Sequence, residues 1–236
     1  MVYIQSDKER LLPHHFDAAC ALYGARDNAQ DVRLTSLEEV ASGKFDALIK
    51  QHLFCGSVEF MTEVWKRIGK NPGVPKNSNR MEEIVTLHRA RNIVDTIGPL
   101  FIKPIQNKLF TGAVYDKMFI SSLKDFSRDT EVIITQAFNQ QILTEWRCYV
   151  HLNKILDARN YSGDFKVMPN WDYAESIIKE NYDTFPDSYA MDIGVLKDAK
   201  NVVIEFNDGW STGNYGMDNS DYYKYLRARY FQIVRS

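Results

Sequence analysis

The most constraining feature of this chain is a strand-like run near its C-terminal end that carries two oxygen-bearing side chains in alternation. The run starts at Val202 and continues into Glu205, Phe206 and Asn207. Because successive side chains of a strand leave opposite faces, Glu205 and Asn207 share one face and Phe206 points into the other. The run therefore predicts a sheet on which two oxygen-bearing side chains converge.

A third acidic side chain, Asp192, lies thirteen residues before Glu205 and between apolar neighbours. A polar turn at residues 197–200 separates the two runs, so a hairpin would place Asp192 on the strand next to Glu205 and Asn207. Oxygen ligands of this kind suit Mg²⁺, which takes one or two carboxylates and completes its shell with water and ATP phosphates. The alternative is a solvent-facing polar edge. Clustered carboxylates repel one another without a cation, which favours the metal.

A lysine at a strand end is the second polar feature. The segment Phe-Ile-Lys-Pro at residues 101–104 is an apolar strand that ends on Lys103. A lysine held in this way is a compact cation suited to phosphate oxygens, and the polar loop at residues 105–112 can fold over them. The alternative is a solvated lysine at a strand terminus, since lysine is usually exposed.

The third feature is a strand and hinge at residues 132–138, followed by Glu145 and Arg147. A hinge backbone offers N–H and C=O groups to an adenine edge, and Gln136 and Phe138 are the candidates for that contact. Glu145 is the candidate for the ribose hydroxyls. Arg147 shares its strand face and can bind a phosphate or a substrate carboxylate bidentately. The alternative is a Glu–Arg pair on a wet sheet face, which contributes little to stability.

Taken in chain order, these features resemble the ATP-grasp superfamily, from about residue 98 to about residue 216. The shared order is a lysine-proline strand end, a hinge followed by a glutamate, and then an aspartate and a Glu-x-Asn pair. The resemblance implies an α+β ATP-grasp fold, in which two α+β lobes hold the nucleotide and a small α/β N-terminal region precedes them. It also implies ATP and Mg²⁺ as cofactors, with Lys103 on the phosphates and the metal on Asp192, Glu205 and Asn207.

The resemblance further implies an ATP-dependent carboxylate-amine ligase that forms an amide or peptide bond. A small-molecule or peptide carboxylate would attack the γ-phosphate to give an acylphosphate, and an amine or similar nucleophile would then displace phosphate. Arg147 or Arg159 would be the catalytic residue that orients the carboxylate or the phosphoryl group. Two alternatives stay open: a non-catalytic nucleotide-binding regulatory or interaction module, and phosphotransfer to a non-carboxylate acceptor.

The sequence departs from the family pattern around the phosphates. The phosphate-covering loop has one glycine, Gly112, and a second phosphate-binding cation upstream is represented only by the weak candidate Arg89. A glycine-rich segment at residues 209–216 allows backbone N–H groups to approach an anion and is a candidate edge of the acceptor pocket. Trp171, Trp210 and Tyr215 are candidates for an aromatic lining, although aromatic residues are more often simply packed.

Local patterns place these features within two domains. Residues 1–80 are expected to form a small α/β region with a strand at 2–4, a helix at 15–23, a mixed run at 45–54 that favours a strand, and a helix capped by Ser57. Two prolines, a glycine and three asparagines at residues 70–80 indicate a boundary. Residues 81–236 are then the ATP-grasp domain, which opens with a helix and continues with strands at 100–102, 132–134, 146–152 and 202–206.

Composition excludes other classes of protein. A formal net charge of -2 and a pI near 6.2 give no basic footprint for nucleic acid. No apolar run approaches the roughly 20 residues that a membrane-spanning helix needs, and no signal-peptide core follows the N-terminus, which predicts a cytoplasmic protein. The three cysteines are scattered without a Cys-x-x-Cys pair, so neither a disulfide framework nor a zinc site is indicated.

Overall fold

The chain leaves its first structural unit once and later returns to it. The computed structural model describes residues 1–7, 12–73, 82–106 and 109–236. Met1–Lys76 and Ile142–Ser236 together form one compact unit, and Asn77–Gln141 form the second. The boundary expected at residues 70–80 lies largely outside the described residues, and the division into residues 1–80 and 81–236 stays a prediction. The return of the chain at residue 142 was not predicted.

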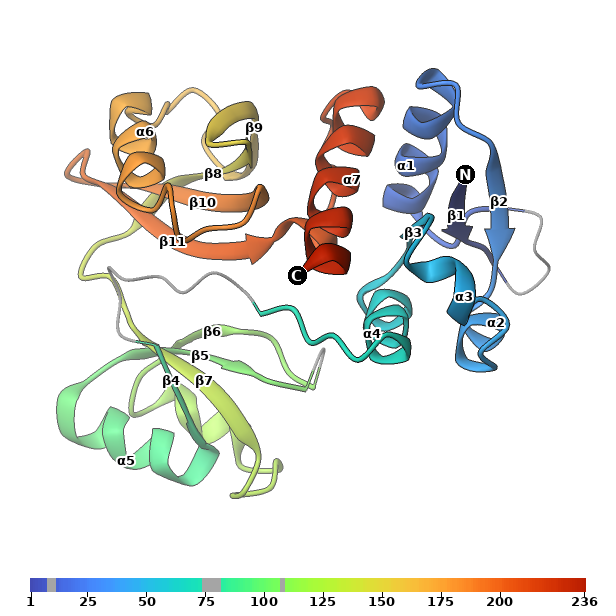
Figure 1. The fold of residues 1–236 in the computed structure, drawn as a ribbon. Coiled ribbons are helices and arrows are strands. Elements are labelled where there is room, and N and C mark those ends of the chain that lie inside the picture. The colour runs from blue at the N-terminus through green and yellow to red at the C-terminus, as the bar shows by residue number, and fades with distance from the viewer. Residues whose placement is uncertain (8–11, 74–81, 107–108) are drawn as a thin grey trace. The chain divides into compact units, whose positions relative to one another are not determined.

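The first unit begins with a three-stranded parallel sheet of order β2-β1-β3 (Figure 1). Its strands and helices follow in the order β1 (Val2–Gln5), α1 (Phe16–Asp27), β2 (Val32–Thr35), α2 (Leu37–Ala41), α3 (Asp46–Ile49), β3 (Leu53–Cys55) and α4 (Val58–Arg67). Every residue of the central strand β1 is buried, as expected of a parallel strand that is covered on both faces. The predicted strand at residues 2–4 is therefore confirmed.

Two helix predictions in this region are confirmed, and one strand prediction is wrong in part. The helix expected at residues 15–23 is α1, and Ser57 caps α4 by accepting a hydrogen bond from the Phe60 N–H at 3.2 Å. The run at 45–54 begins as helix α3 and becomes strand only at β3. Phe45 and Ile49 are both buried, and their spacing of four places them on one helical face. The contiguous apolar letters between them were a misleading strand signal.

A four-stranded antiparallel sheet of order β11-β10-β8-β9 completes the first unit. Its strands are β8 (Ile142–His151), β9 (Lys154–Gly163), β10 (Ser188–Leu196) and β11 (Asn201–Asp208), and α6 (Trp171–Glu180) lies between β9 and β10 in sequence. Buried residues of α6 pack with Cys148, Met191 and Phe206 in one apolar cluster. This face of the sheet is dry, so the other face is available for polar side chains. The predicted hairpin of β10 and β11 is confirmed.

The C-terminal helix α7 (Asn219–Arg235) joins the two sheets of the first unit. It runs beside α1 (Figure 1), and its buried tyrosines share a core cluster with the parallel sheet and with Tyr149 of β8. The Tyr230 hydroxyl donates to the Ile49 carbonyl at 2.8 Å. This shared core fixes the antiparallel sheet against the N-terminal region.

The second unit is a four-stranded antiparallel sheet of order β4-β7-β5-β6. Its elements are β4 (Glu82–Thr86), α5 (Leu87–Ile97), β5 (Leu100–Pro104), β6 (Ala113–Tyr115), the short 3-10 helix η1 (Phe119–Leu123) and β7 (Glu131–Gln136). Leu87, Ala90 and Val94 pack α5 on the buried side chains of the sheet. The helix expected to open this region is wrong over 82–86, because β4 precedes α5. Only Val85 of β4 is buried, so pairing with β7 rather than a local pattern defines this strand.

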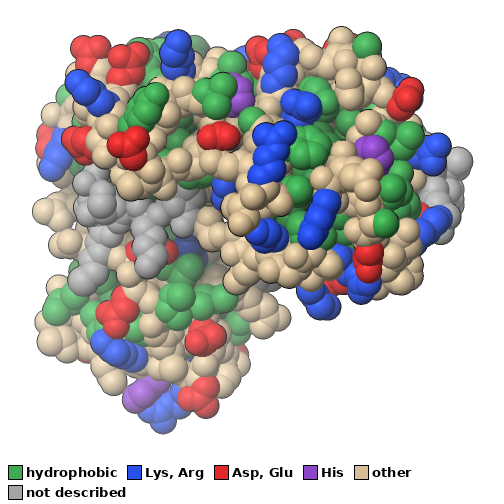
Figure 2. Space-filling model, in the orientation of Figure 1, with side chains coloured by type: hydrophobic (Ala, Val, Ile, Leu, Met, Phe, Trp, Pro, Cys, Tyr) green, Lys and Arg blue, Asp and Glu red, His purple; other side chains and the backbone are tan. Residues whose placement is uncertain are grey.

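The surface carries charge of both signs. Acidic and basic side chains both occur on the visible face of each unit, together with scattered apolar ones (Figure 2). Among the helices that the structure describes, none is both long enough and apolar enough to cross a membrane.

Candidate functional site

A row of four charged side chains crosses the antiparallel sheet. Arg159 of β9 is paired with Arg147 of β8, which is paired with Asp192 of β10. Asp192 is paired in turn with Glu205 of β11. Directly opposed residues of an antiparallel sheet project from the same face, so these four share the face opposite α6. The strand register thus brings together residues that the sequence places far apart.

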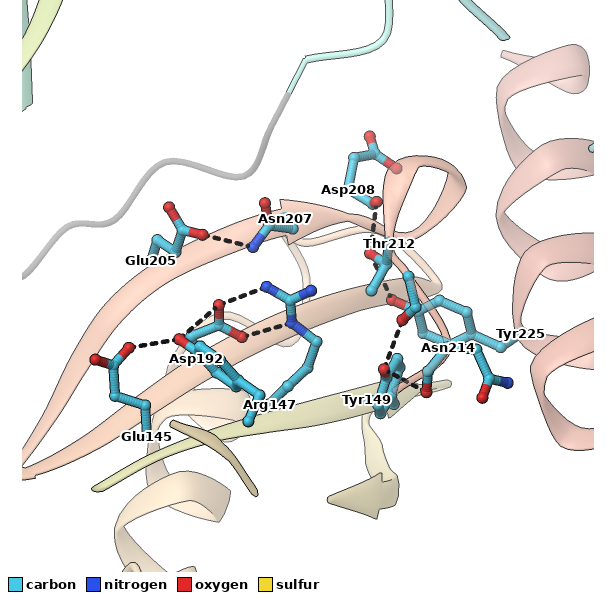
Figure 3. A network of polar contacts seen from close by, with 12 residues as sticks. Glu145, Arg147, Tyr149, Asp192, Glu205, Asn207, Asp208, Thr212, Asn214 and Tyr225 are labelled. Carbon is cyan, nitrogen blue, oxygen red and sulfur yellow. Dashed lines mark hydrogen bonds and ion pairs between the residues drawn. The ribbon is translucent and has the colours of Figure 1, made fainter. Parts of the chain in front are cut away.

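Arg147 and Asp192 form a buried bidentate ion pair at the centre of this row (Figure 3). Arg147 Nε donates to Asp192 Oδ1 at 2.8 Å and Nη2 donates to Oδ2 at 2.7 Å. Burial lowers the pKa of Arg147, but the hydrogen bonds and charge of Asp192 outweigh this effect and raise that pKa overall. Burial raises the pKa of Asp192, against the opposing bonds from Arg147. The fork-to-carboxylate geometry is that of a charged pair.

Glu205 and Asn207 lie next to this pair on β11, as their alternation predicts (Figure 3). Asn207 Nδ2 donates to Glu205 Oε1 at 3.1 Å, and both side chains are half-buried. A carboxylate offers about four acceptor sites, so Asp192 keeps acceptor capacity beyond the two bonds from Arg147. Two carboxylates and an amide oxygen on one sheet face fit the donor set of Mg²⁺. Within the described residues, no group of three His, Cys, Asp or Glu side chains is placed to hold a metal, so Asn207 is an essential member of this set.

Tyr161 links Glu145 to the ion pair. Its hydroxyl is 2.7 Å from Glu145 Oε2 and 3.3 Å from Asp192 Oδ2. The pairing of β8 with β9 shifts at this point, and Tyr161 is the residue left over. Such a bulge re-aims a side chain. Burial raises the pKa of Tyr161, so the phenol keeps its proton and donates it. No sequence signal marked this residue, because a bulge is a property of the pairing between two strands.

Tyr215 covers the Arg147 guanidinium from the glycine-rich segment. The Arg147 Cζ atom lies 4.8 Å from the centre of the Tyr215 ring and 5.4 Å from the centre of the Tyr161 ring. The Tyr149 hydroxyl lies 2.6 Å from the Gly213 carbonyl oxygen and attaches this segment to β8. The glycine-rich segment expected to border a pocket therefore lies against the polar face.

The other two aromatic candidates lie elsewhere. Trp171 packs edge-to-face on Trp146 with its ring centre 5.8 Å away, in the region of the apolar cluster. Trp210 packs on Trp65 at 6.1 Å, against the N-terminal core. Both follow the packing alternative for aromatic residues.

The two remaining arginine candidates are held by neighbouring carboxylates. Arg159 Nε and Nη2 both donate to Asp157 Oδ2, at 2.9 and 2.7 Å, so Arg159 lies on the polar face but is anchored one strand away from the buried pair. Arg89 is an exposed residue of α5 and pairs with Glu83 at 2.8 Å. Arg147 is thus the arginine that contacts the carboxylate of the predicted metal set.

Three predicted nucleotide-binding residues lie in the second unit. Lys103 is half-buried on β5 opposite Ile133 of β7. An added Cβ on Gly112 would approach the Lys103 Cβ to 3.0 Å, so the small residue permits this close contact. Gln136 is the exposed last residue of β7, and Phe138 follows it half-buried. Their nucleotide roles stay predictions.

The chain belongs to the ATP-grasp family. Residues 80–225 match a family described as an ATP-grasp domain, the second family of its clade. The matched range contains the whole charged row as well as β5 and β7. No curated protein matches the chain.

Solved structures share this fold at low sequence identity. The ATP-grasp ligase PsnB, complexed with precursor peptide PsnA2 and AMPPNP, is 11% identical with a TM-score of 0.54, covering 97% of this chain and 96% of PsnB. The D-alanine–D-alanine ligase of Bacillus anthracis, complexed with ATP, is 13% identical with a TM-score of 0.53, covering 99% and 97%. The N5-carboxyaminoimidazole synthetase of Staphylococcus aureus, complexed with ADP, is 10% identical with a TM-score of 0.53, covering 97% and 76%. The predicted α+β ATP-grasp fold is confirmed.

Proposed function

We propose that this protein is an ATP- and Mg²⁺-dependent ligase that activates a carboxylate as an acylphosphate for attack by an amine or a similar nucleophile. The observation that carries the proposal is the charged row on β9, β8, β10 and β11, where a pinned guanidinium borders two carboxylates and an amide. Membership of the ATP-grasp family supports it. So do similar structures that are named as ligases with a peptide or with ATP.

The metal and phosphate roles follow from donor chemistry. Asp192, Glu205 and Asn207 would hold Mg²⁺, which when bound neutralises charge on the ATP phosphates. Lys103 supplies a positive charge for the same phosphates. Gln136 and Phe138 offer backbone groups to adenine, and Glu145 accepts from the ribose hydroxyls, with Tyr161 holding the Glu145 carboxylate at 2.7 Å. Positioning and electrostatics then supply most of the catalysis.

Arg147 is the residue that we propose to bind the reacting oxyanion. A guanidinium has five N–H donors, and Asp192 takes two of them. The others remain as donors for a substrate carboxylate or the transferring phosphoryl group. The carboxylate oxygen attacks the γ-phosphorus and ADP leaves. The amine nitrogen then attacks the acyl carbon and loses a proton, and inorganic phosphate leaves with the electron pair of the broken C–O bond.

The test is ATP turnover in the presence of candidate substrates. The purified protein with Mg²⁺ and ATP is screened against mixtures of small carboxylic acids, short peptides and amines, and ADP release is measured. Hydroxylamine is added to trap an acylphosphate as a hydroxamate. We expect ADP release that depends on a carboxylate, together with hydroxamate formation.

A matched pair of variants tests the metal assignment. Glu205→Gln should abolish Mg²⁺-dependent ATP consumption and leave the fold intact, whereas Glu180→Gln on the exposed end of α6 should behave as the unmodified protein. Normal turnover in Glu205→Gln would remove the metal assignment. Nucleotide binding without any turnover would instead favour a non-catalytic module, and turnover that depends on an alcohol would favour phosphotransfer. The cytoplasmic location, and the expectation of neither nucleic acid nor membrane as a partner, stay predictions.

A further inference from the structure

Tyr215 has a backbone conformation that a bulky residue rarely adopts. Its φ is 48°, in the left-handed region where the Cβ atom crowds the carbonyl oxygen. Among the described residues, four other non-glycine residues have positive φ, and they lie directly after α1 or in the β8–β9 and β10–β11 turns: Ala29, Leu152, Asn153 and Ala199. Tyr215 lies in neither a hairpin turn nor a helix end. Strain of this kind persists only where neighbouring structure imposes it.

The neighbouring backbone does impose it. Asn214 is buried, and its N–H donates to Asp17 Oδ1 at 2.7 Å. Its side chain reaches over Tyr215: Asn214 Oδ1 accepts from the Gly216 N–H at 2.8 Å, and Nδ2 donates to the Met217 carbonyl at 3.1 Å. These bonds hold the chain on both sides of Tyr215. A glycine would satisfy the same backbone without strain, so the tyrosine side chain needs a separate explanation.

The side chain supplies a ring against the Arg147 guanidinium. Asp192 holds one edge of that guanidinium through Nε and Nη2, and the Tyr215 ring lies 4.8 Å from its central carbon. The Tyr161 ring lies 5.7 Å from the Tyr215 ring and contacts the same cation. Two hydrogen bonds along one edge and an aromatic ring against the face together fix both the position and the plane of an arginine. Tyr215 itself is 50% exposed, so it is the ring on the solvent side.

We infer that Tyr215 is a positioning residue for the reaction: its ring fixes the plane of Arg147 and thereby aims the remaining guanidinium donors at the substrate oxyanion. The inference rests on the proposed function, since it takes Arg147 as the oxyanion-binding residue. It also explains why a strained backbone is kept at residue 215. The ring, and not the phenol hydroxyl or the loop backbone, is the active feature.

Three substitutions separate the ring from the backbone. Tyr215→Phe keeps the ring. Tyr215→Ala removes the ring and keeps a Cβ in the strained conformation, and Tyr215→Gly removes both the ring and the strain. Thermal unfolding should therefore show Tyr215→Gly melting a few degrees above Tyr215→Ala, because glycine adopts positive φ freely.

The functional readouts should follow the ring instead. With the carboxylate substrate found in the turnover screen, KM for the carboxylate should rise about tenfold in both Tyr215→Ala and Tyr215→Gly, as expected for loss of one cation–π contact, and stay normal in Tyr215→Phe. KM for ATP should change little. Independently of turnover, the Arg147 Nε–H resonance should carry a ring-current shift in the unmodified protein and in Tyr215→Phe, and lose it in the other two variants.

Each outcome decides between the ring and its alternatives. Normal KM in Tyr215→Gly with a raised KM in Tyr215→Ala would show that only the backbone matters and would overturn the inference. A raised KM in Tyr215→Phe would assign the effect to the hydroxyl and would also overturn it. If no carboxylate supports turnover, the proposed ligase function fails, whereas the Arg147 resonance still reports whether the ring holds the guanidinium.

Discussion

Arg147 and Asp192 face each other across β8 and β10 in a bidentate ion pair, although 45 residues separate them in the chain. The pair is nearly closed to solvent, with 10% of the Arg147 side chain and 1% of the Asp192 side chain exposed. Taking two charges out of water is costly, and the loss is offset only while both partners are present. The pair therefore links the stability of the sheet to the chemistry of the proposed site.

Removing one partner of this pair should destabilise the protein strongly. Asp192→Asn and Arg147→Met each leave one buried charge without its partner, which costs about 3–5 kcal/mol. The double variant Arg147→Met/Asp192→Leu should recover much of this loss and remain inactive. Urea unfolding at neutral pH measures the effect. Arg67→Met, which breaks a solvent-screened pair with Asp46, is the control and should change the free energy of unfolding far less. Single variants as stable as the unmodified protein would contradict the buried pair.

Loss of the Tyr161 hydroxyl should weaken nucleotide binding. Tyr161→Phe keeps the ring on Arg147 but leaves the Glu145 carboxylate without its 2.7 Å hydrogen bond. A hydrogen bond to a charged group contributes about 1.5–3 kcal/mol, so the Kd for Mg²⁺-AMPPNP should rise about tenfold or more. Calorimetry with AMPPNP and with its 2′,3′-dideoxy analogue makes the test specific. An equal loss with both nucleotides would show that Glu145 does not recognise the ribose.

Lys103 should act on the phosphates and not on the base. Lys103→Ala should raise the Kd for ATP about tenfold or more, the scale of one charge-assisted hydrogen bond, and leave adenosine binding unchanged. Lys117→Ala removes an exposed lysine of the same unit and is the matched control. Unchanged ATP affinity in Lys103→Ala would remove its phosphate role.

His15 should make stability depend on pH. Its Nδ1 accepts the Ala18 N–H at 3.1 Å and caps α1, which requires that nitrogen to be unprotonated. Burial, the largest effect, and the adjacent His14 lower the pKa of His15 below its ordinary value of 6.5, against the opposing charge of Asp17. The unfolded chain therefore binds more protons as pH falls below 6.5, and the contribution of this group is full above that pH and is lost as pH falls through the lowered value.

The matched variant for this prediction is His15→Asn. Asparagine is a strong N-cap and does not titrate in this range, so the variant should keep the stability of the neutral protein and lose part of the decline between about pH 6.5 and pH 5. The free energy of unfolding measured across this window provides the comparison. An unchanged decline in His15→Asn would assign the pH dependence to other groups.

Much of the site could be predicted because strand alternation is local. The spacing of Glu205 and Asn207 is sufficient to place them on one face, and the polar turn before them indicates the hairpin that brings Asp192 alongside. The cap of α4 is equally local, since Ser57 bonds to an N–H three residues away. In each case the interacting groups are neighbours in sequence or are joined by one short turn.

Tertiary structure decided the rest, because it depends on pairing between distant strands. The register that sets Arg147 against Asp192, and the bulge that turns Tyr161 towards Glu145, have no counterpart in either strand alone. The same holds for β4, which is a strand because β7 lies beside it. By itself the sequence determined which side chains share a face. Only the folded sheet determined which of them touch, because contacts across strands follow from register and packing, which no local period encodes.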